Sequence, residues 1–339
     1  MKYILLSLLS ICSFIHLSAQ DTFSIIAADP VTGEVGAAGA TCVDGIAQWG
    51  GIQLLNEIIP GKGGVNAQAF ICLNPHINLD LGIQAMESGM SPEEIIEWLR
   101  MNDGCNSGNF NPEFRQYGIV DFDADMNVRT TAFTGNLTSD YKNHIIGPTY
   151  AIQGNILIGQ QVLDGMEDGF NNTEGSLAQK LMGAMQGANI PGADQRCLAR
   201  GTSSTSAFLR VVKPEDVFGQ HYLELSILEM PFGQEPIDSL QILFDNFLES
   251  TTSTETVLQN TSISIIPNPS NQFIHFKTSD QLDVEQVNFY NNQGHLISSR
   301  KVNDIVTEQM DVSNLSQGIY FVELTSKSIT PIVLKFVKM

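Results

Sequence analysis

The chain is poor in basic residues. Its 339 residues include 17 Lys and Arg against 37 Asp and Glu, which gives a formal net charge of −20. A surface that binds nucleic acid or an anionic membrane needs a basic face, so this charge balance argues against both kinds of partner. Acidity alone names no substrate, and we interpret it as a contribution to solubility.

A long hydrophobic run is missing beyond residues 1–20. Within that segment, Lys2 precedes an apolar stretch over residues 3–17, which is too short for a membrane-spanning helix and is typical of a secretory signal. Small residues at its end suit a signal peptidase that cleaves after Ala19 or Gln20. No later stretch reaches the roughly 18 uncharged apolar residues that a spanning helix needs. We therefore expect an exported protein without a transmembrane segment.

Cysteine is scarce, and the chain has no C-x-x-C pair. Cys12 belongs to the signal, so four cysteines remain in the exported chain: Cys42, Cys72, Cys105 and Cys197. An even number in an exported protein favours two disulfides over a zinc site. Three pairings are possible. We favour Cys42–Cys72 with Cys105–Cys197, because Cys42 and Cys72 lie in neighbouring early segments.

Other signatures of metal and cofactor chemistry are also missing. Asp121, Asp123 and Asp125 imitate the start of an EF-hand loop, but Met126 and Ala132 stand where that loop needs glycine and glutamate. The histidines show no H-E-x-x-H spacing, and no G-x-S-x-G motif or phosphate-binding glycine loop occurs. We expect neither a metal nor a cofactor, and we interpret the three aspartates as a solvated hairpin tip.

Strand and helix patterns come in blocks along the first two thirds of the chain. Turn residues at Asp29–Gly33 and Asp123–Asn127 predict two hairpins, and Ser91-Pro92-Glu93-Glu94 predicts a helix that begins with a capping box. The predicted helices are 74–88, 91–101, 160–170, 176–187 and 236–249. Strands precede, separate and follow the helix pairs. Blocks of this kind favour an α+β fold in which helix layers cover antiparallel sheets.

A Ser- and Thr-rich stretch, residues 250–262, has no core pattern and predicts a linker. The charge changes at the same place: residues 21–262 carry 10 Lys and Arg against 30 Asp and Glu, whereas residues 263–339 carry 6 against 7. Beyond the linker, short strand patterns and turn signals such as Asn292-Gln293-Gly294 predict a small all-β sandwich. We expect a signal peptide at 1–20, a main domain at 21–249 and a C-terminal domain at 263–339.

Four stretches of the C-terminal segment occur in the order of a known sorting domain. They are Pro267-Asn268-Pro269, VNFYNNQGHLI, DVSNLSQGIYFVEL and the basic end LKFVKM. With them, residues 263–339 resemble the type A C-terminal sorting domain of the type IX secretion system, found in the Bacteroidetes. The resemblance implies that the type IX machinery carries the protein across the outer membrane, after which it is released or attached to the cell surface.

The main domain also carries a set of family motifs in order. They are TFSIIAADPVTGEVG, NAQAF, RQYGIVDF, FTG, YAIQGNILIG, GADQR and SAFLRVV. Residues 22 to about 249 thereby resemble the DUF1028 family, a domain of unknown function that is similar in fold to the N-terminal-nucleophile (Ntn) hydrolases. The resemblance implies a four-layer αββα sandwich. It names no substrate, although the peptidoglycan-binding modules of some relatives point to cell-wall amides.

Thr22 is the candidate nucleophile under this resemblance. An Ntn hydrolase needs its nucleophile at the chain terminus, because the free α-amine of that residue is the base that activates its hydroxyl. Asp21 stands before Thr22, so cleavage after Ala19 or Gln20 leaves the amine in a peptide bond. Trimming by an aminopeptidase, or self-cleavage of the Asp21–Thr22 bond, would free it. The alternative is that Thr22 is an ordinary β-branched strand residue.

Four further site residues are carried over by family position. Gln153 and Asn155 are candidate oxyanion donors, and their spacing places both side chains on one face of a strand. Asp194 and Arg196 are expected to form an ion pair that orients the amine or binds a substrate carboxylate. Arg115 ranks behind them, as a surface or inter-layer contact.

The sequence thus predicts an exported Ntn-hydrolase-like protein that cleaves an amide, in a peptide or a cell-wall cross-bridge, through Thr22. A non-catalytic secreted or cell-surface binding protein that keeps the fold is the alternative. The two differ in whether Thr22 gains a free amine close to donors suited to an oxyanion.

Overall fold

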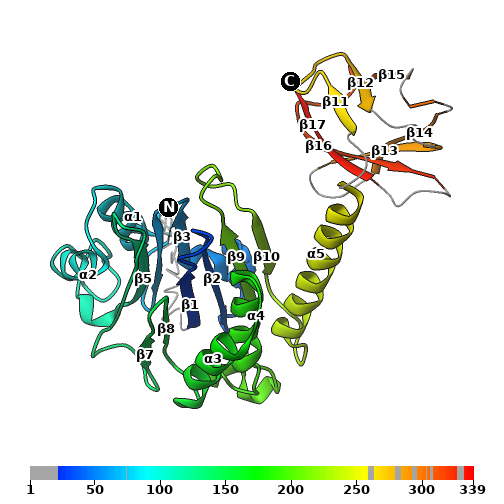
Figure 1. The fold of residues 1–339 in the computed structure, drawn as a ribbon. Coiled ribbons are helices and arrows are strands. Elements are labelled where there is room, and N and C mark those ends of the chain that lie inside the picture. The colour runs from blue at the N-terminus through cyan, green and yellow to red at the C-terminus, as the bar shows by residue number, and fades with distance from the viewer. Residues whose placement is uncertain are drawn as a thin grey trace, which may run out of the picture. The chain divides into compact units, whose positions relative to one another are not determined.

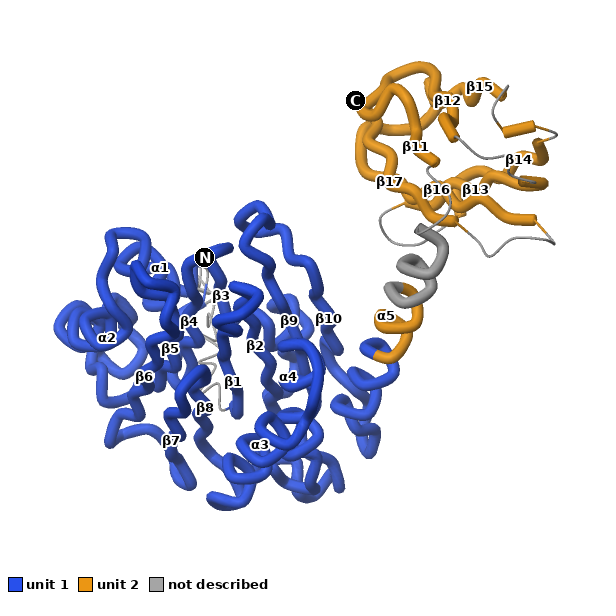
Figure 2. Tube along the Cα trace, viewed as in Figure 1, with its two compact units in different colours: residues 1–244 blue, residues 245–339 orange. Residues whose placement is uncertain are grey.

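A computed structural model describes residues 22–73, 75–258, 263–278, 284–291, 296–302, 304–305, 308–326 and 332–339. The predicted signal, Asp21, the last part of the predicted linker and the Asn292-Gln293-Gly294 turn lie outside these residues. The chain divides into two compact units between Phe244 and Asp245 (Figure 2). Each unit is described by itself below.

Two antiparallel sheets form the centre of the first unit (Figure 1). Sheet A has the strand order β10-β9-β2-β1-β8-β7. Its strands are β1 Thr22–Ala28, β2 Val35–Thr41, β7 Asn143–Ile146, β8 Tyr150–Gly154, β9 Ser206–Val212 and β10 Leu223–Ile227. Sheet B has the order β3-β4-β5-β6, from β3 Asn56–Ile59, β4 Gly63–Gln68, β5 Gln116–Phe122 and β6 Val128–Thr134. The first strand of the described chain, β1, is therefore central in sheet A.

Helices cover the outer face of each sheet. The pair α1 Ile77–Glu87 and α2 Pro92–Met101 packs on sheet B through a shared apolar core that includes Val65, Ile83 and Ile119. The pair α3 Gln161–Asn172 and α4 Leu177–Gly187 lies over sheet A (Figure 1). The layer order is helix, sheet, sheet, helix, so the predicted α+β, αββα architecture is confirmed.

Local signals account for several element boundaries. Ser91 and Glu94 form the predicted capping box at the start of α2, where each side chain accepts from the other residue's backbone N–H. Asp123 Oδ1 accepts from the N–H groups of Asp125 and Asn127, which closes the predicted hairpin between β5 and β6. These bonds join residues within four positions of one another, which is why sequence alone could identify them.

The space between the sheets has an apolar end and a polar end. The apolar end holds a cluster that includes Ile26, Ala28, Ile58, Val120 and Phe208. The polar end holds buried hydroxyl and amide side chains from strands of both sheets: Thr22, Ser24, Thr41, Asn56, Asn66, Gln68, Gln116, Gln153 and Asn155. Because buried polar groups need partners, this end can only be stable as a connected hydrogen-bond network.

Some boundaries differ from the sequence prediction. The apolar stretches 51–59 and 64–72 predict two strands, but a short 3-10 helix, Ile52–Leu55, takes up most of the first, and β4 ends at Gln68. The helix α5, Pro236–Leu258, begins in the first unit, includes the boundary between Phe244 and Asp245, and continues into the predicted linker. Its Ser- and Thr-rich end carries no core pattern from which a helix could be predicted.

The predicted disulfide pairing is wrong. The bonds are Cys42–Cys197, with Cα atoms 5.8 Å apart, and Cys72–Cys105, with Cα atoms 5.5 Å apart. Cys42 follows β2 of sheet A and Cys72 follows β4 of sheet B, so closeness in sequence did not place them together. Cys42 and Cys72 each pair instead with a cysteine in a later connecting segment, one that follows the helix pair on the same sheet.

The second unit is a small β-sandwich, as predicted. Its three-stranded sheet has the order β11-β12-β15 and its four-stranded sheet the order β14-β13-β16-β17. The strands are β11 Ile263–Ile266, β12 Phe273–Thr278, β13 Gln286–Asn291, β14 Leu296–Lys301, β15 Gln309–Asp311, β16 Gly318–Thr325 and β17 Ile332–Lys338. A common core includes Ile274, Val287, Val322 and Phe336. None of the helices in the described part of the chain is both long and apolar enough to cross a membrane.

Candidate functional site

Thr22 is the first residue of β1, and β1 lies between β2 and β8 in sheet A. Thr22 is paired with Thr41, the last residue of β2. Its carbonyl oxygen accepts a hydrogen bond, 3.1 Å long, from the backbone N–H of Asn155, which lies just past the end of β8. Thr22 is completely buried in the full chain, and its Oγ1 has no hydrogen-bond partner. A buried hydroxyl without a partner is costly to the fold, so a threonine at this position calls for an explanation.

Ser24 is the first branching point of the polar network beside Thr22. Its Oγ donates to Gln68 Oε1 over 2.6 Å and accepts from Asn66 Nδ2 at 3.1 Å and from Gln153 Nε2 at 2.6 Å. Gln68 Nε2 in turn donates to the carbonyl oxygen of Thr22 over 3.2 Å. The network therefore joins sheet B to the first residue of β1.

Gln116, the first residue of β5, is the second branching point. Its Nε2 donates to the carbonyl oxygens of Gly154, at 2.9 Å, and Asn143, at 3.1 Å. Its Oε1 accepts from Gln68 Nε2 at 2.7 Å and from Asn155 Nδ2 at 3.0 Å. This one side chain of sheet B holds the ends of β7 and β8 in sheet A, together with the side chain of Asn155.

Gln153, in β8, and Asn155, just past the end of β8, both contact the polar end of the sandwich. Gln153, however, lies opposite Ser24 rather than Thr22, and its Nε2 is bound to Ser24. Its Oε1 lies against Gly118 of β5, where any Cβ would overlap it. Gly118 therefore leaves the space that lets Gln153 reach across the inter-sheet layer.

The backbone is strained where two strands leave the polar end. Ile156, next to Asn155, has a φ of 49°, and Ala69 and Phe70, next to Gln68, have φ values of 62° and 47°. Such angles are unfavourable for residues with a Cβ, above all a β-branched one, and they occur frequently at functional sites. Backbone bonds from Ile156 N–H to Ser139 and from Gln195 N–H to Ile156 hold the first of these turns.

Asp194 and Arg196 form the predicted ion pair. Arg196 donates to both carboxylate oxygens, with Nε 3.0 Å from Oδ1 and Nη2 2.6 Å from Oδ2. Asp194 is fully buried and also accepts from the N–H of Cys42 at 2.8 Å, whereas 31% of the Arg196 side chain is exposed. The 193–197 segment is bonded to the chain beyond β2, through Cys42, and to the chain beyond β8, through Leu157. It thus spans the two strands that flank Thr22.

Arg115 is not the surface contact that the sequence allowed. Only 1% of its side chain is exposed, and it forms a two-point ion pair with Asp103, which is equally buried. It also donates to the backbone carbonyl oxygens of Phe70, Cys105 and Ser107. Arg115 therefore fixes the loops around the Cys72–Cys105 disulfide and one of the strained turns.

Sequence reasoning missed the sheet B members of the network and Ser24. The available signal was the polar alternation of Thr22 with Ser24 in β1 and of Asn66 with Gln68 in β4, within strands that are otherwise apolar. Every second residue of a strand points to the same face, so such pairs mark a polar patch on a buried face. Which strands face each other could not be read from this pattern.

Two ionisable side chains of the sheets, those of His144 and Asp121, are bound to neighbouring residues. His144, in β7, has its Nδ1 2.9 Å from Thr134 Oγ1, and burial lowers the pKa of its ring. Asp121 is paired with Arg129 rather than open to an ion. Among the residues that the structure describes, no cluster of three or more His, Cys, Asp or Glu side chains is arranged to hold a metal ion.

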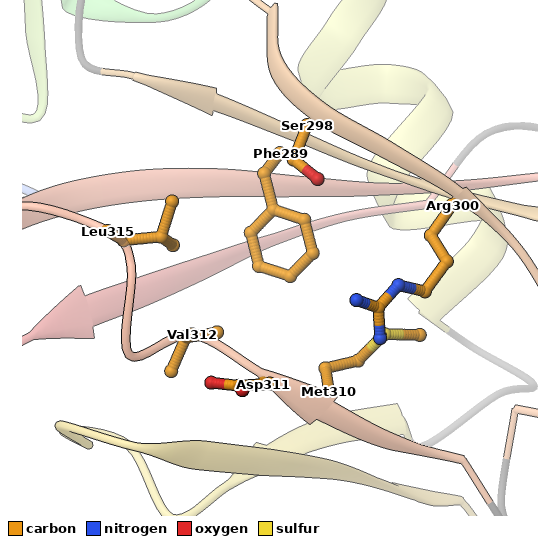
Figure 3. A pocket seen from close by; sticks show the side chains of 7 residues that line it. All are labelled: Phe289, Ser298, Arg300, Met310, Asp311, Val312 and Leu315. Atoms are coloured by element: carbon orange, nitrogen blue, oxygen red, sulfur yellow. The ribbon is translucent and has the colours of Figure 1, made fainter.

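A separate pocket lies inside the C-terminal sandwich (Figure 3). The ring of Phe289 faces it, and Arg300 stands at its side, with Nη1 3.9 Å from the sulfur of Met310. The pocket belongs to strands β13, β14 and β15 of the second unit.

Comparisons with known proteins identify both parts of the chain. Residues 22–240 match the family of unknown function DUF1028, and residues 264–339 match the secretion system C-terminal sorting domain. No curated protein matches the chain. Among solved structures it is similar to the crystal structure of protein SPO2555 from Silicibacter pomeroyi, of the DUF1028 family. The identity is 23% and the TM-score 0.51, over 67% of this chain and 88% of that chain. At this identity the likeness shows the fold alone.

Proposed function

Since the chain belongs to the DUF1028 family, which has no assigned function, and ends in a sorting domain that marks it for export, we propose an activity from the site itself. The exported protein is an amide hydrolase whose nucleophile is Thr22, once proteolysis has made Thr22 the first residue. One observation carries the proposal: the buried Oγ1 of Thr22, which has no hydrogen-bond partner, lies at the start of a central strand beside a polar network.

The nucleophile and the base both belong to Thr22. The free α-amine, with a reference pKa of about 7.7–8.0, takes the hydroxyl proton as Oγ1 attacks the amide carbonyl carbon. The tetrahedral intermediate collapses, the C–N bond breaks, and the ammonium returns the proton to the leaving amine. Water, deprotonated by the same amine, then attacks the ester and releases the acid.

The burial of Thr22 supports a precursor that is inactive before processing. With residues still attached to its nitrogen, Thr22 has an amide instead of a basic amine, and none of its surface is exposed. Removal of the preceding residues is then the activating step. We propose an exposed peptide or cell-wall cross-bridge as the substrate class, with Arg196, whose side chain reaches the surface, as the group that binds a substrate carboxylate.

The alternative, a non-catalytic secreted or cell-surface binding protein, is favoured by the same burial if the chain is never processed to Thr22. The mature terminus therefore decides between the two functions.

Intact mass and N-terminal sequencing of protein exported by a native host are the first test. A chain that begins at Thr22 supports the hydrolase. The next step is a library of peptide and cell-wall amides, with Thr22→Ala as the inactive variant and Thr22→Ser as the variant that keeps a hydroxyl. A stable chain that begins at Gln20 or Asp21, without amidase activity, would overturn the proposal.

A further inference from the structure

The orientation of the amide groups in the polar network follows from the carbonyl oxygens that they face. Gln116 Nε2 lies within 3.1 Å of two backbone carbonyl oxygens, those of Asn143 and Gly154. A carbonyl oxygen only accepts hydrogen bonds, so the Gln116 atom at this position must be the nitrogen. The oxygen of the same amide must then point the other way.

This fixes the side chain of Asn155 as well. The atom of Asn155 that lies 3.0 Å from Gln116 Oε1 must be a donor, and is therefore Nδ2. Its Oδ1 is directed away from Gln116, is buried, and has no hydrogen-bond partner. The orientation is thus decided by the network and does not depend on telling oxygen from nitrogen in an isolated amide.

Two amide oxygens of this network, Gln153 Oε1 and Asn155 Oδ1, are buried without a donor, and the second belongs to the residue opposite Thr22. The backbone bond from Asn155 N–H to the Thr22 carbonyl oxygen makes the two residues neighbours across β1 and β8. Side chains directly opposite in an antiparallel pair share a face, with Cβ atoms roughly 4.5–5.5 Å apart. Asn155 Oδ1 therefore lies within reach of the groups of Thr22, and in this structure none of them donates to it.

We infer that Asn155 positions the base of the reaction rather than the oxyanion. Its Oδ1 accepts a hydrogen bond from the α-amine of processed Thr22, which leaves the nitrogen lone pair directed at Oγ1. Gln116 holds Asn155 in this orientation and is itself a positioning residue. The inference rests on the proposed function, because Thr22 has an α-amine only after proteolysis has made it the first residue.

The pKa of the Thr22 amine is the quantity to measure. The chain 22–339 is produced with one initiator methionine, which the host removes before a small residue such as threonine. The reactivity of the amine toward trace amounts of labelled acetic anhydride is followed by mass spectrometry from pH 5 to 10. The variants are Asn155→Leu, Asn155→Asp and Gln116→Met. Asn127→Asp, on the exposed β5–β6 hairpin, is the control for the charge change.

Opposite shifts are expected from the two Asn155 substitutions. Leucine removes the acceptor of the ammonium and lowers the pKa of the Thr22 amine. Aspartate adds a negative charge beside the ammonium and raises that pKa by roughly one to three. Gln116→Met lowers it less than Asn155→Leu does, and Asn127→Asp leaves it unchanged. A merely structural role for Asn155 would not reverse sign between leucine and aspartate.

An unchanged pKa in both Asn155 variants, with their thermal unfolding near that of the parent, would overturn the inference. Asn155 would then be the oxyanion donor, and its loss would slow amide cleavage equally at all pH values. The readout is independent of hydrolysis. If the variants shift the pKa of the Thr22 amine as expected but the parent chain has no amidase activity, the proposed function is refuted, whereas the contact between Asn155 and the amine is established.

Discussion

Arg115 and Asp103 form a two-point ion pair in which each side chain is only 1% exposed, with Nε 2.8 Å from Oδ2 and Nη2 3.2 Å from Oδ1. The remaining donors of Arg115 bind backbone carbonyl oxygens, including that of Phe70 at 2.6 Å. The pair therefore joins the start of β5, which carries Gln116, to the strained turn that follows Gln68. The pair thus contacts the chain next to two amides of the polar network, Gln68 and Gln116.

Arg115→Met is expected to lower the free energy of unfolding by about 3–5 kcal/mol, because it leaves the Asp103 carboxylate buried without its partner. Urea unfolding followed by circular dichroism measures the change. The control is Arg100→Met, which breaks the exposed contact between Arg100 and Glu113 at 3.5 Å and should cost no more than about 1 kcal/mol. Equal losses in the two variants would contradict a structural role for the buried pair.

Local order could be predicted from the sequence, whereas long-range pairing could not. The capping box at Ser91 and the hairpin at Asp123 depend on neighbours within four residues. The partner of Arg115 lies twelve residues away in an irregular loop, and the Cys42–Cys197 bond spans 155 residues. Such contacts depend on which connecting segments meet at one end of the sandwich, and hydrophobic periodicity carries no information about that.

Thr22→Val is expected to stabilise a chain in which residue 22 is still preceded by a peptide bond. The substitution keeps the shape and removes a buried hydroxyl without a partner, so the free energy of unfolding should rise by about 1 kcal/mol. Thr205→Val is the matched control. Thr205 is also fully buried, but its Oγ1 donates to the Thr41 carbonyl oxygen at 3.1 Å, and its loss should cost about 1 kcal/mol.

Denaturant midpoints of the two valine variants should therefore move in opposite directions. A loss of stability in both variants would mean that the Thr22 hydroxyl stabilises the fold. The hydroxyl would then no longer be evidence for a catalytic role of Thr22.

Only part of the candidate site, in and beside sheet A, could be predicted from the sequence. Family position supplied Gln153, Asn155, Asp194 and Arg196, and the period of a strand predicted that the first two share a face. Their partners Ser24, Gln68 and Gln116 come from three different strands, two of them in the other sheet. A single sequence gives no indication of the stacking of two sheets, so it could not show that the Asn155 amide is already committed to Gln116.

His76 should make the protein less stable in mild acid. Burial is the main cause that lowers the pKa of its ring from 6.5 to about 4. Between these two pKa values the unfolded chain binds a proton at His76 and the folded chain does not. The contribution of neutral His76 to the free energy of unfolding is therefore complete above about pH 6.5 and is lost as the pH falls toward 4. The loss is at most about 3 kcal/mol. Unfolding at pH 7.5, 6, 5 and 4 measures it.

His76→Asn removes the titration and keeps the helix cap, because the side chain of His76 accepts from Leu79 N–H and asparagine is a good N-cap. Its stability should depend less on pH between 6.5 and 4 than that of the parent chain. His275→Asn, at an exposed position of the C-terminal sandwich, should leave the dependence as it is. A parallel pH dependence of the parent and His76→Asn would show that other groups cause the acid sensitivity.

The Cys42–Cys197 disulfide should matter to both stability and the site, because it closes a loop of 155 residues and holds the segment that contains Asp194. The double variant Cys42→Ala/Cys197→Ala is expected to lose about 2–5 kcal/mol in guanidinium unfolding. Cys72→Ala/Cys105→Ala, which opens a loop of 33 residues, should lose a comparable amount.

The two double variants should differ in their effect on Asp194. Only Cys42→Ala/Cys197→Ala removes a covalent bond next to the hydrogen bond between the Asp194 carboxylate and the Cys42 N–H. In chains that begin at Thr22, the amine should therefore titrate more like an exposed terminus in the first variant than in the second. An amine pKa that is the same in both would mean that the ion pair with Arg196 and the backbone bonds hold this segment without the disulfide.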